Sequence, residues 1–205
     1  MLERHSSLAT STSNGGFTLV ELLAAMLVGT TILGAFTGFY LAEQRALRRH
    51  QLEIAASQSL RTALEQMSRD LRSAGLDPST NAGAGIVLAT SDEVDFTRDA
   101  DANGTIDSSD PVETLRFRRN GTSLESYVAD GATPWVPLAD NVASNGAIFR
   151  YYRCDGSEIG TLPASATDLD AIARIDVTLS VNGIGGVTFT RRESESVRLR
   201  NKVCS

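Results

Sequence analysis

An apolar stretch from Phe17 to Ala42 is the feature that most limits what this chain can fold into. Glu21 is its only charged residue, and no proline interrupts it. A helix needs about 20 apolar residues to cross a bilayer, so this stretch is long enough to span one. It is also longer than the apolar core of an ordinary secretory signal, which has about 7 to 15 residues. The sequence therefore predicts a membrane-spanning helix that stays in the mature protein.

Glu21 requires an explanation, because a carboxylate deep in a bilayer costs roughly 2.5 to 3.5 kcal/mol on insertion scales. One interpretation is a plain signal anchor whose glutamate lies near the membrane surface. The residues in front of the apolar stretch favour another. Residues 1–16 form a polar leader that ends in two glycines, Gly15 and Gly16. Because glycine has no side chain, a processing enzyme can reach the extended backbone at this junction.

The junction Gly16-Phe17, followed by Glu21 and the apolar helix, resembles the prepilin signature of type IV pilins and type II secretion pseudopilins. This resemblance implies that prepilin peptidase cuts between Gly16 and Phe17 and methylates the new amine of Phe17. It also implies that Glu21 pairs with the N-terminal ammonium of a neighbouring subunit during assembly. Such a pair is strong in an apolar environment, because water does not screen it.

The same resemblance implies where the protein works and with what. The expected partners are prepilin peptidase, other major and minor pilins, and the inner-membrane pilus assembly platform. The expected location is the bacterial inner membrane, with a single pass and a periplasmic head, and later the pilus filament or its tip. Arg45, Arg48 and Arg49 oppose this orientation, because positive charge favours the cytoplasmic side. The processing motif is the more specific signal, so we expect the periplasmic head.

Beyond the membrane segment, residues 43–77 are amphipathic. The apolar side chains recur at helical spacing and comprise Ala56, Leu60, Ala63, Leu64, Met67 and Leu71. Gly75 and Pro78 are typical of a helix end. We therefore expect one helix over residues 17–77, with a transmembrane half at 17–42 and an amphipathic half at 43–77.

Residues 78–205 change to a period of two, which predicts antiparallel strands. The strand-like runs are 85–90, 93–98, 113–119, 124–129, 147–153, 173–181 and 186–193, and residues 155–170 are expected to form a loop. A sheet that covers the apolar stripe of the helix gives an α+β, pilin-like architecture. Two segments, residues 69–78 and 196–201, resemble PilW-type minor pilins more than the J-type minor pseudopilins.

Residues 99–110 match the pattern DxDxNGxIDxxD of a twelve-residue calcium loop. In such a loop, alternate oxygens surround a hard cation, and a glycine at the sixth position permits the sharp turn. The pattern assigns the ligands to Asp99, Asp101, Asn103, the carbonyl of Thr105, Asp107 and Asp110. The expected cofactor is therefore calcium. A solvated acidic turn is the alternative, since Asp, Asn and Gly also favour turns.

The rest of the chain offers little for catalysis. Histidine occurs only at His5 and His50, and no P-loop, GxSxG or dinucleotide fingerprint is present. Cys154 and Cys204 lack metal-knuckle spacing, so they are either a disulfide, if the head is exported, or two separate thiols. We expect no enzyme, but a structural subunit.

Net charge of −6 argues against a surface built for nucleic acid, so nucleic acid is not an expected partner. Arg116 and Arg118 alternate along one predicted strand, which leaves a DNA-binding pilus module for uptake as an alternative of another class. The leading hypothesis is a PilW-like minor pilin that assembles or primes a type IV pilus. A minor pseudopilin of the type II secretion system is the alternative within the family.

Overall fold

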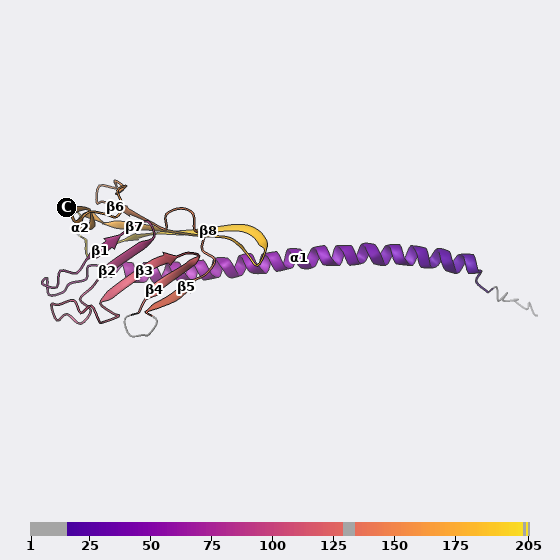
Figure 1. Ribbon diagram of the computed structural model, residues 1–205, viewed down its shortest axis with the longest axis horizontal. Helices are drawn as coiled ribbons and strands as arrows, with labels where there is room; N and C mark the ends of the chain where they lie inside the picture. The colour runs from indigo at the N-terminus through magenta and orange to yellow at the C-terminus, as the bar shows by residue number, and fades with distance from the viewer. Residues whose placement is uncertain (1–15, 129–133, 203, 205) are drawn as a thin grey trace, which may run out of the picture. The chain divides into compact units, whose positions relative to one another are not determined.

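The computed structural model describes residues 16–128, 134–202 and 204 (Figure 1). The chain divides into two compact units, residues 1–48 and 49–205. The elements are α1 (Leu19–Leu71), β1 (Ile86–Ala89), β2 (Glu93–Thr97), β3 (Thr114–Asn120), β4 (Ser123–Tyr127), β5 (Trp135–Ala139), β6 (Phe149–Tyr152), α2 (Ala166–Ala171), β7 (Arg174–Ile184) and β8 (Val187–Arg198). This order of one long helix followed by antiparallel strands confirms the predicted α+β, pilin-like architecture.

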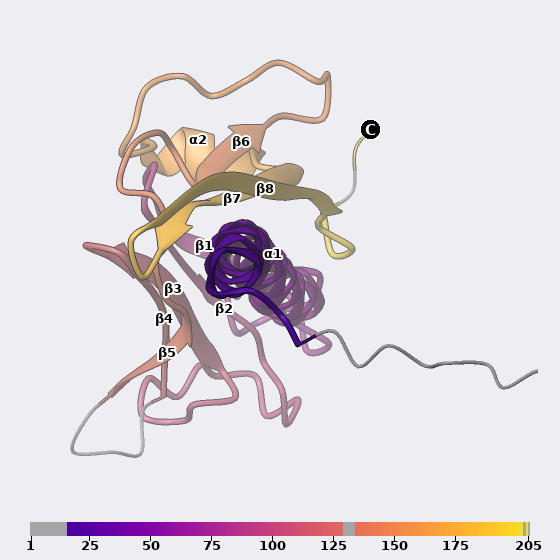
Figure 2. The same ribbon diagram turned by 90° about the vertical axis from the view of Figure 1, so that its right-hand side faces the viewer.

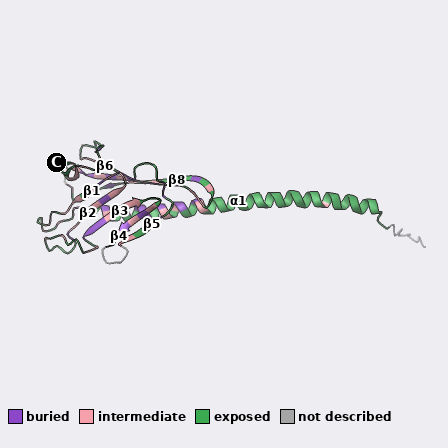
Figure 3. Cartoon of the chain, in the orientation of Figure 1, coloured by how far each residue is buried: buried purple, intermediate pink, exposed green. Residues whose placement is uncertain are grey.

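The first unit contains the N-terminal part of α1. Its most apolar 18-residue segment has a mean hydropathy of 2.0, and none of the residues in that segment is buried. Figure 3 shows this part of the helix in the colour of exposed residues along almost its whole length. Apolar side chains such as Phe36 and Phe39 are 69% and 67% exposed. A helix with apolar side chains on all sides requires lipid or other protein around it, because water solvates such a surface poorly.

The second unit places the rest of α1 between two antiparallel sheets. One sheet has five strands in the order β1-β2-β3-β4-β5, and the other has three in the order β6-β7-β8. Figure 2 looks along the helix and shows the two sheets on different sides of it. The sequence predicts a single sheet, whereas the structure has two. Two sheets cover more of the helix than one flat sheet can.

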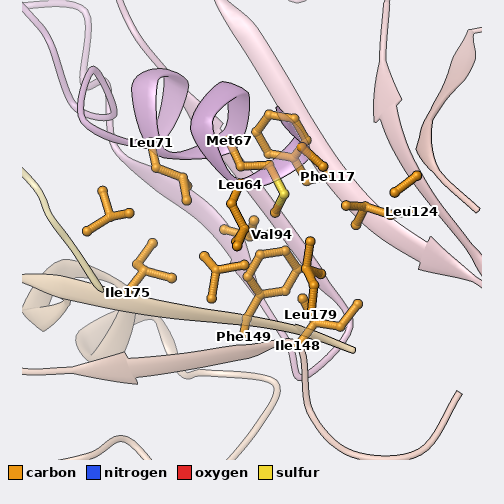
Figure 4. Close-up of a cluster of buried hydrophobic side chains, with 14 of the residues drawn as sticks. Leu64, Met67, Leu71, Val94, Phe117, Leu124, Ile148, Phe149, Ile175 and Leu179 are labelled. Carbon is orange, nitrogen blue, oxygen red and sulfur yellow. The ribbon is translucent and has the colours of Figure 1, made fainter. Parts of the chain in front are cut away.

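The core of the second unit forms where α1 meets both sheets. Every residue of the predicted stripe is buried, namely Ala56, Leu60, Ala63, Leu64, Met67 and Leu71. Figure 4 shows Leu64, Met67 and Leu71 pointing from α1 toward side chains of both sheets, among them Phe117 and Phe149. The amphipathic stripe was therefore predicted correctly.

The helix ends at Leu71, earlier than the expected residue 77. After Leu71 the backbone tightens into short turns, and the N–H of Gly75 then donates to the carbonyl of Thr97 at 3.0 Å. Gly75 has a φ of 73°, the left-handed conformation expected of a glycine that ends a helix. The residues after the helix therefore bond to β2 instead of extending α1.

β5 and α2 are not among the elements that the sequence predicts. Pro137 lies within β5, and proline argues against a strand because it lacks an N–H for the ladder. The structure resolves this by placing β5 at the edge of the five-stranded sheet, with Pro137 opposite Glu125. α2 begins in the expected loop and is only six residues long. Ser165 caps it by accepting from the N–H of Asp168 at 3.2 Å.

Candidate functional site

The Gly16-Phe17 junction lies outside regular secondary structure, just before α1. Phe17 is 90% exposed, and apart from the chain neighbours of Gly16 no described atom lies within 4 Å of the position that a Cβ on Gly16 would occupy. Residues 1–15, the rest of the predicted leader, lie outside the described residues. The described part of the junction is thus exposed, as a processing enzyme requires.

Glu21 takes part in the start of α1. Its Oε2 accepts from the backbone N–H of Thr18 at 3.0 Å, and the Thr18 hydroxyl lies 3.3 Å from the Glu21 nitrogen and accepts from it. This reciprocal arrangement is a capping box, which satisfies N–H groups that the first turn leaves free. In an isolated chain Glu21 therefore stabilises its own helix, and its carboxylate is exposed at the N-terminal end.

A comparison with family models agrees with this geometry. Residues 11–37 match the model of the prokaryotic N-terminal methylation motif. Over this segment the chain therefore has the N-terminal motif of type IV pilin-like prepilin proteins. The motif implies processing by prepilin peptidase and assembly with other pilins, and the family that it defines is structural rather than enzymatic. A search of curated proteins found no match to the chain. The matched region ends before the second unit begins, so it does not separate minor pilins from pseudopilins.

The acidic loop brings together a different set of side chains from the predicted one. Carboxylate oxygens of Asp99, Asp101 and Glu113 lie within 4.8 Å of one another. Asp99 is 0% and Glu113 is 1% exposed, whereas Asp101 is exposed. Both oxygens of Asp99 accept backbone N–H groups, from Asn103 at 3.1 Å and from Gly104 at 3.1 Å. The first two predicted ligands are therefore adjacent, and Glu113 is an acid that the twelve-residue pattern does not include.

The other predicted ligands bind their own turns. Asn103 Oδ1 accepts from the N–H of Thr105 at 2.8 Å. Asp107 Oδ1 accepts from the hydroxyl of Ser109 at 2.6 Å and from its N–H at 2.8 Å, and these hydrogen bonds, the one from the hydroxyl first, lower the pKa of Asp107 because they favour the charged form. Asp110 Oδ1 accepts from the N–H of Val112 at 2.7 Å. The carboxylates of Asp107 and Asp110 are not part of the group that Asp99, Asp101 and Glu113 form.

Glu113 occupies a position that sequence spacing does not reveal. It follows the loop after Pro111, and its two oxygens accept from the N–H of Ala100 at 3.1 Å and from that of Asp107 at 2.8 Å. It therefore closes the loop from the far side. The available signal in the sequence was the residue type, because the longer side chain of a glutamate usually supplies the last ligand of such loops.

Cys154 and Cys204 form a disulfide, with their Cα atoms 5.5 Å apart. Both side chains are exposed. The bond ties the C-terminal segment after β8 to the turn that follows β6.

Arg116 and Arg118 lie on the outer face of the five-stranded sheet, as alternation predicts. Both contact acids: Arg118 Nε lies 2.8 Å from Glu125, and Arg116 Nε lies 3.6 Å from Asp95. Both also stack on aromatic rings. The Arg118 guanidinium lies 3.6 Å from the centre of the Trp135 ring, which joins the edge strand β5 to β3 across β4. These arginines are paired within the sheet, so they are a poor basis for binding DNA.

Burial raises the pKa of Asp95 to about 6; Arg116 opposes the rise and Glu93 adds to it. Its Oδ1 is buried without a hydrogen-bond partner among the described residues. The unfolded chain releases this proton near pH 4, so stability is lost as pH rises from about 4 to about 6. We expect Asp95→Asn to raise the free energy of unfolding at pH 7.5 by about 1 kcal/mol, after allowance for solvent screening, and to raise the melting temperature accordingly. Near pH 4 the substitution should give no gain. Trp135 fluorescence measures the transition; an equal gain at both pH values contradicts the prediction.

Proposed function

We propose that this protein is a minor, PilW-like subunit that assembles or primes a type IV pilus. Prepilin peptidase cleaves the bond between Gly16 and Phe17 and methylates the Phe17 amine. The observation that carries the proposal is a single continuous feature: an open Gly16-Phe17 junction, Glu21 in the first turn, and an apolar helix that no other part of its unit covers. Assembly into a filament supplies the cover that this helix lacks.

The charge on Glu21 explains why assembly is favourable. Cleavage creates an ammonium on Phe17, and in a single subunit both charges lie in apolar surroundings without a full partner. In a filament, the carboxylate of one subunit pairs with the ammonium of its neighbour. Removing one partner of such a pair costs about 3 to 5 kcal/mol, because the other charge remains buried.

We therefore expect Glu21→Ala to reduce incorporation into pili by roughly 100-fold or more, which corresponds to that cost. Sheared pilus fractions and membranes are compared by immunoblotting. Thr18→Ala is the matched control, because it removes the capping hydroxyl but keeps the carboxylate, and it should cost only about 1 kcal/mol. Incorporation of Glu21→Ala at the parental level contradicts the pairing mechanism.

Two further measurements test the proposal as a whole. Mass spectrometry of the membrane-extracted protein should show a chain that begins at methylated Phe17. Gene deletion, scored for piliation and twitching against protein secretion, separates the type IV pilus from the type II secretion alternative. A chain that still begins at Met1 contradicts both the type IV pilus assignment and the type II secretion alternative.

The proposed orientation places the second unit in the periplasm. The disulfide between Cys154 and Cys204 supports this, because disulfides persist in oxidising compartments and are rare in the cytoplasm. Arg45, Arg48 and Arg49 favour the opposite orientation by the positive-inside rule. Protease protection in spheroplasts distinguishes the two, since only a periplasmic head is digested before lysis.

We further propose that the acidic loop binds calcium through Asp99, Asp101 and Glu113. The observation in favour is that two of these carboxylates are buried, yet no arginine or lysine of the described residues forms an ion pair with any of them. Burying a charge without a counter-ion is costly. A hard divalent cation compensates them, and carboxylate oxygens are the ligands that calcium prefers.

Calcium at about 10 mM is therefore expected to stabilise the second unit by about 1 to 3 kcal/mol, for a dissociation constant typical of extracellular sites. The melting temperature is followed by Trp135 fluorescence with and without a chelator. Asp99→Asn and Glu113→Gln should each abolish the response. Asp110→Asn is the matched control and should retain it. No calcium-dependent shift in the parent protein contradicts the site.

A further inference from the structure

An open depression at the C-terminal end of β8 has an unusual concentration of positive charge. Its lining consists of Arg72, Ser196, Arg198, Leu199, Arg200, Lys202 and Cys204. Four of these side chains are cationic and none is a carboxylate, although the whole chain has a net charge of −6. The cations come from three places: the turn after α1, the last residue of β8, and the segment that follows it. A basic site in an acidic protein is a local feature that composition does not predict.

Two of these cations have no acidic partner among the described residues. Arg72 contacts Glu195 at 3.0 Å, and the Lys202 ammonium donates to the carbonyl of Asp170. Arg198 and Arg200 are exposed and form no ion pair with any described residue. They differ in this from Arg116 and Arg118, which contact acids on the other sheet.

The strand register adds a cost that an anion relieves. Arg198 lies directly opposite Arg174 in the β7–β8 ladder. Like charges directly opposite one another destabilise a sheet. Asp176, two positions further along β7, lies 3.2 Å from the guanidinium of Arg174 and also accepts from Ser196 at 2.6 Å. Arg174 is thus partly neutralised, and Arg198 is left facing solvent.

We propose that this depression binds the phosphate backbone of a nucleic acid. Arginine guanidinium groups match phosphate oxygens in geometry as well as charge. The cations are spread over three segments instead of converging on one point, which suits a chain of charges better than a single phosphate. Leu199 is the only large aliphatic side chain among the described residues of the lining, and it is 6% exposed, so these residues offer no apolar group for insertion into a membrane.

The disulfide supports such a site because it attaches the segment after β8 to another part of the chain. Cys204 lines the depression, and its bond to Cys154 fixes the segment that carries Arg200 and Lys202. Asn201 adds a second attachment, since its Nδ2 donates to the carbonyl of Ala74 at 3.1 Å. Side chains on a fixed segment lose less conformational entropy on binding than those on a free terminus. This binding activity is independent of the structural role in the pilus.

The test uses the full processed chain in nanodiscs of neutral lipid and a fluorescent DNA duplex of about 24 base pairs, followed by anisotropy. We expect salt-sensitive binding. Arg198→Ala with Arg200→Ala should weaken it about tenfold or more near 0.1 M salt and reduce the salt slope by about 2, one for each lost phosphate contact. Arg116→Ala with Arg118→Ala is the matched control, because it changes the net charge equally, and it should alter affinity less than about twofold.

Several other results of this experiment would overturn the proposed nucleic-acid site. Equal losses in the two double variants overturn the site, because they indicate an effect of net charge alone. Competition by polyglutamate as effective as that by unlabelled DNA, or tighter binding to anionic lipid vesicles, identifies another class of partner and also overturns it. The melting transition of Trp135 checks that the variants fold. If the double variant does not fold, Arg200→Gln replaces it, and unchanged affinity in that variant refutes the proposal.

Discussion

Replacing both Cys154 and Cys204 by serine is expected to lower the free energy of unfolding of the second unit by about 4 kcal/mol. The two residues are separated by 50 positions, and the chain-entropy model assigns this stabilisation to closing a loop of that length in the unfolded state. The loss is a large fraction of the 5 to 15 kcal/mol that typical domains possess. Denaturant titration of the full chain in detergent, followed by Trp135 fluorescence, measures it.

Reduction of the parent protein provides the control for this prediction. Reductant should destabilise the parent as much as the double replacement does, and it should leave the double variant unchanged. The exposure of both sulfur-bearing side chains means that reductant reaches the bond without unfolding. A difference below about 1 kcal/mol between parent and variant contradicts a stabilising role for the disulfide.

Local patterns in the sequence predict those elements whose burial is periodic. The stripe on α1 repeats over several turns, so Leu60, Leu64, Met67 and Leu71 all reach the core as expected. Strands such as β2 and β7 alternate between buried and less buried residues with similar clarity. β5 does not, because Pro137 and a position at the sheet edge remove the usual signs. The division into two sheets depends on long-range pairing, which no local period encodes.

The candidate sites show the same limit. The junction of Gly16 and Phe17 with Glu21 is contiguous, so it is legible in the sequence and matches the methylation motif. Spacing also identifies Asp99 and Asp101. Glu113 comes into contact with them only because the chain turns back into β3, and its role depends on that fold. The basic depression at the end of β8 likewise combines Arg72 with residues more than a hundred positions later.

Met67→Ala is expected to lower the free energy of unfolding by about 2 to 4 kcal/mol. Met67 is 0% exposed on α1, and in Figure 4 it points toward the ring of Phe117. Truncation removes buried methylene and sulfur contacts and leaves a cavity that close-packed neighbours fill only in part. Because both sheets contribute to the core around α1, the loss should appear as one cooperative transition of the whole second unit.

Ile54→Ala is the matched control for this prediction, since Ile54 lies on the same helix in the same unit but is 58% exposed. It should cost less than about 1 kcal/mol in detergent, as surface substitutions usually do. In assembled pili Ile54→Ala is expected to have a larger effect than it has on the isolated chain, because an exposed apolar residue on this helix is available to neighbouring subunits. If Ile54→Ala lowers incorporation into filaments while leaving the melting temperature unchanged, the exposed face of the helix serves assembly and the buried face serves folding.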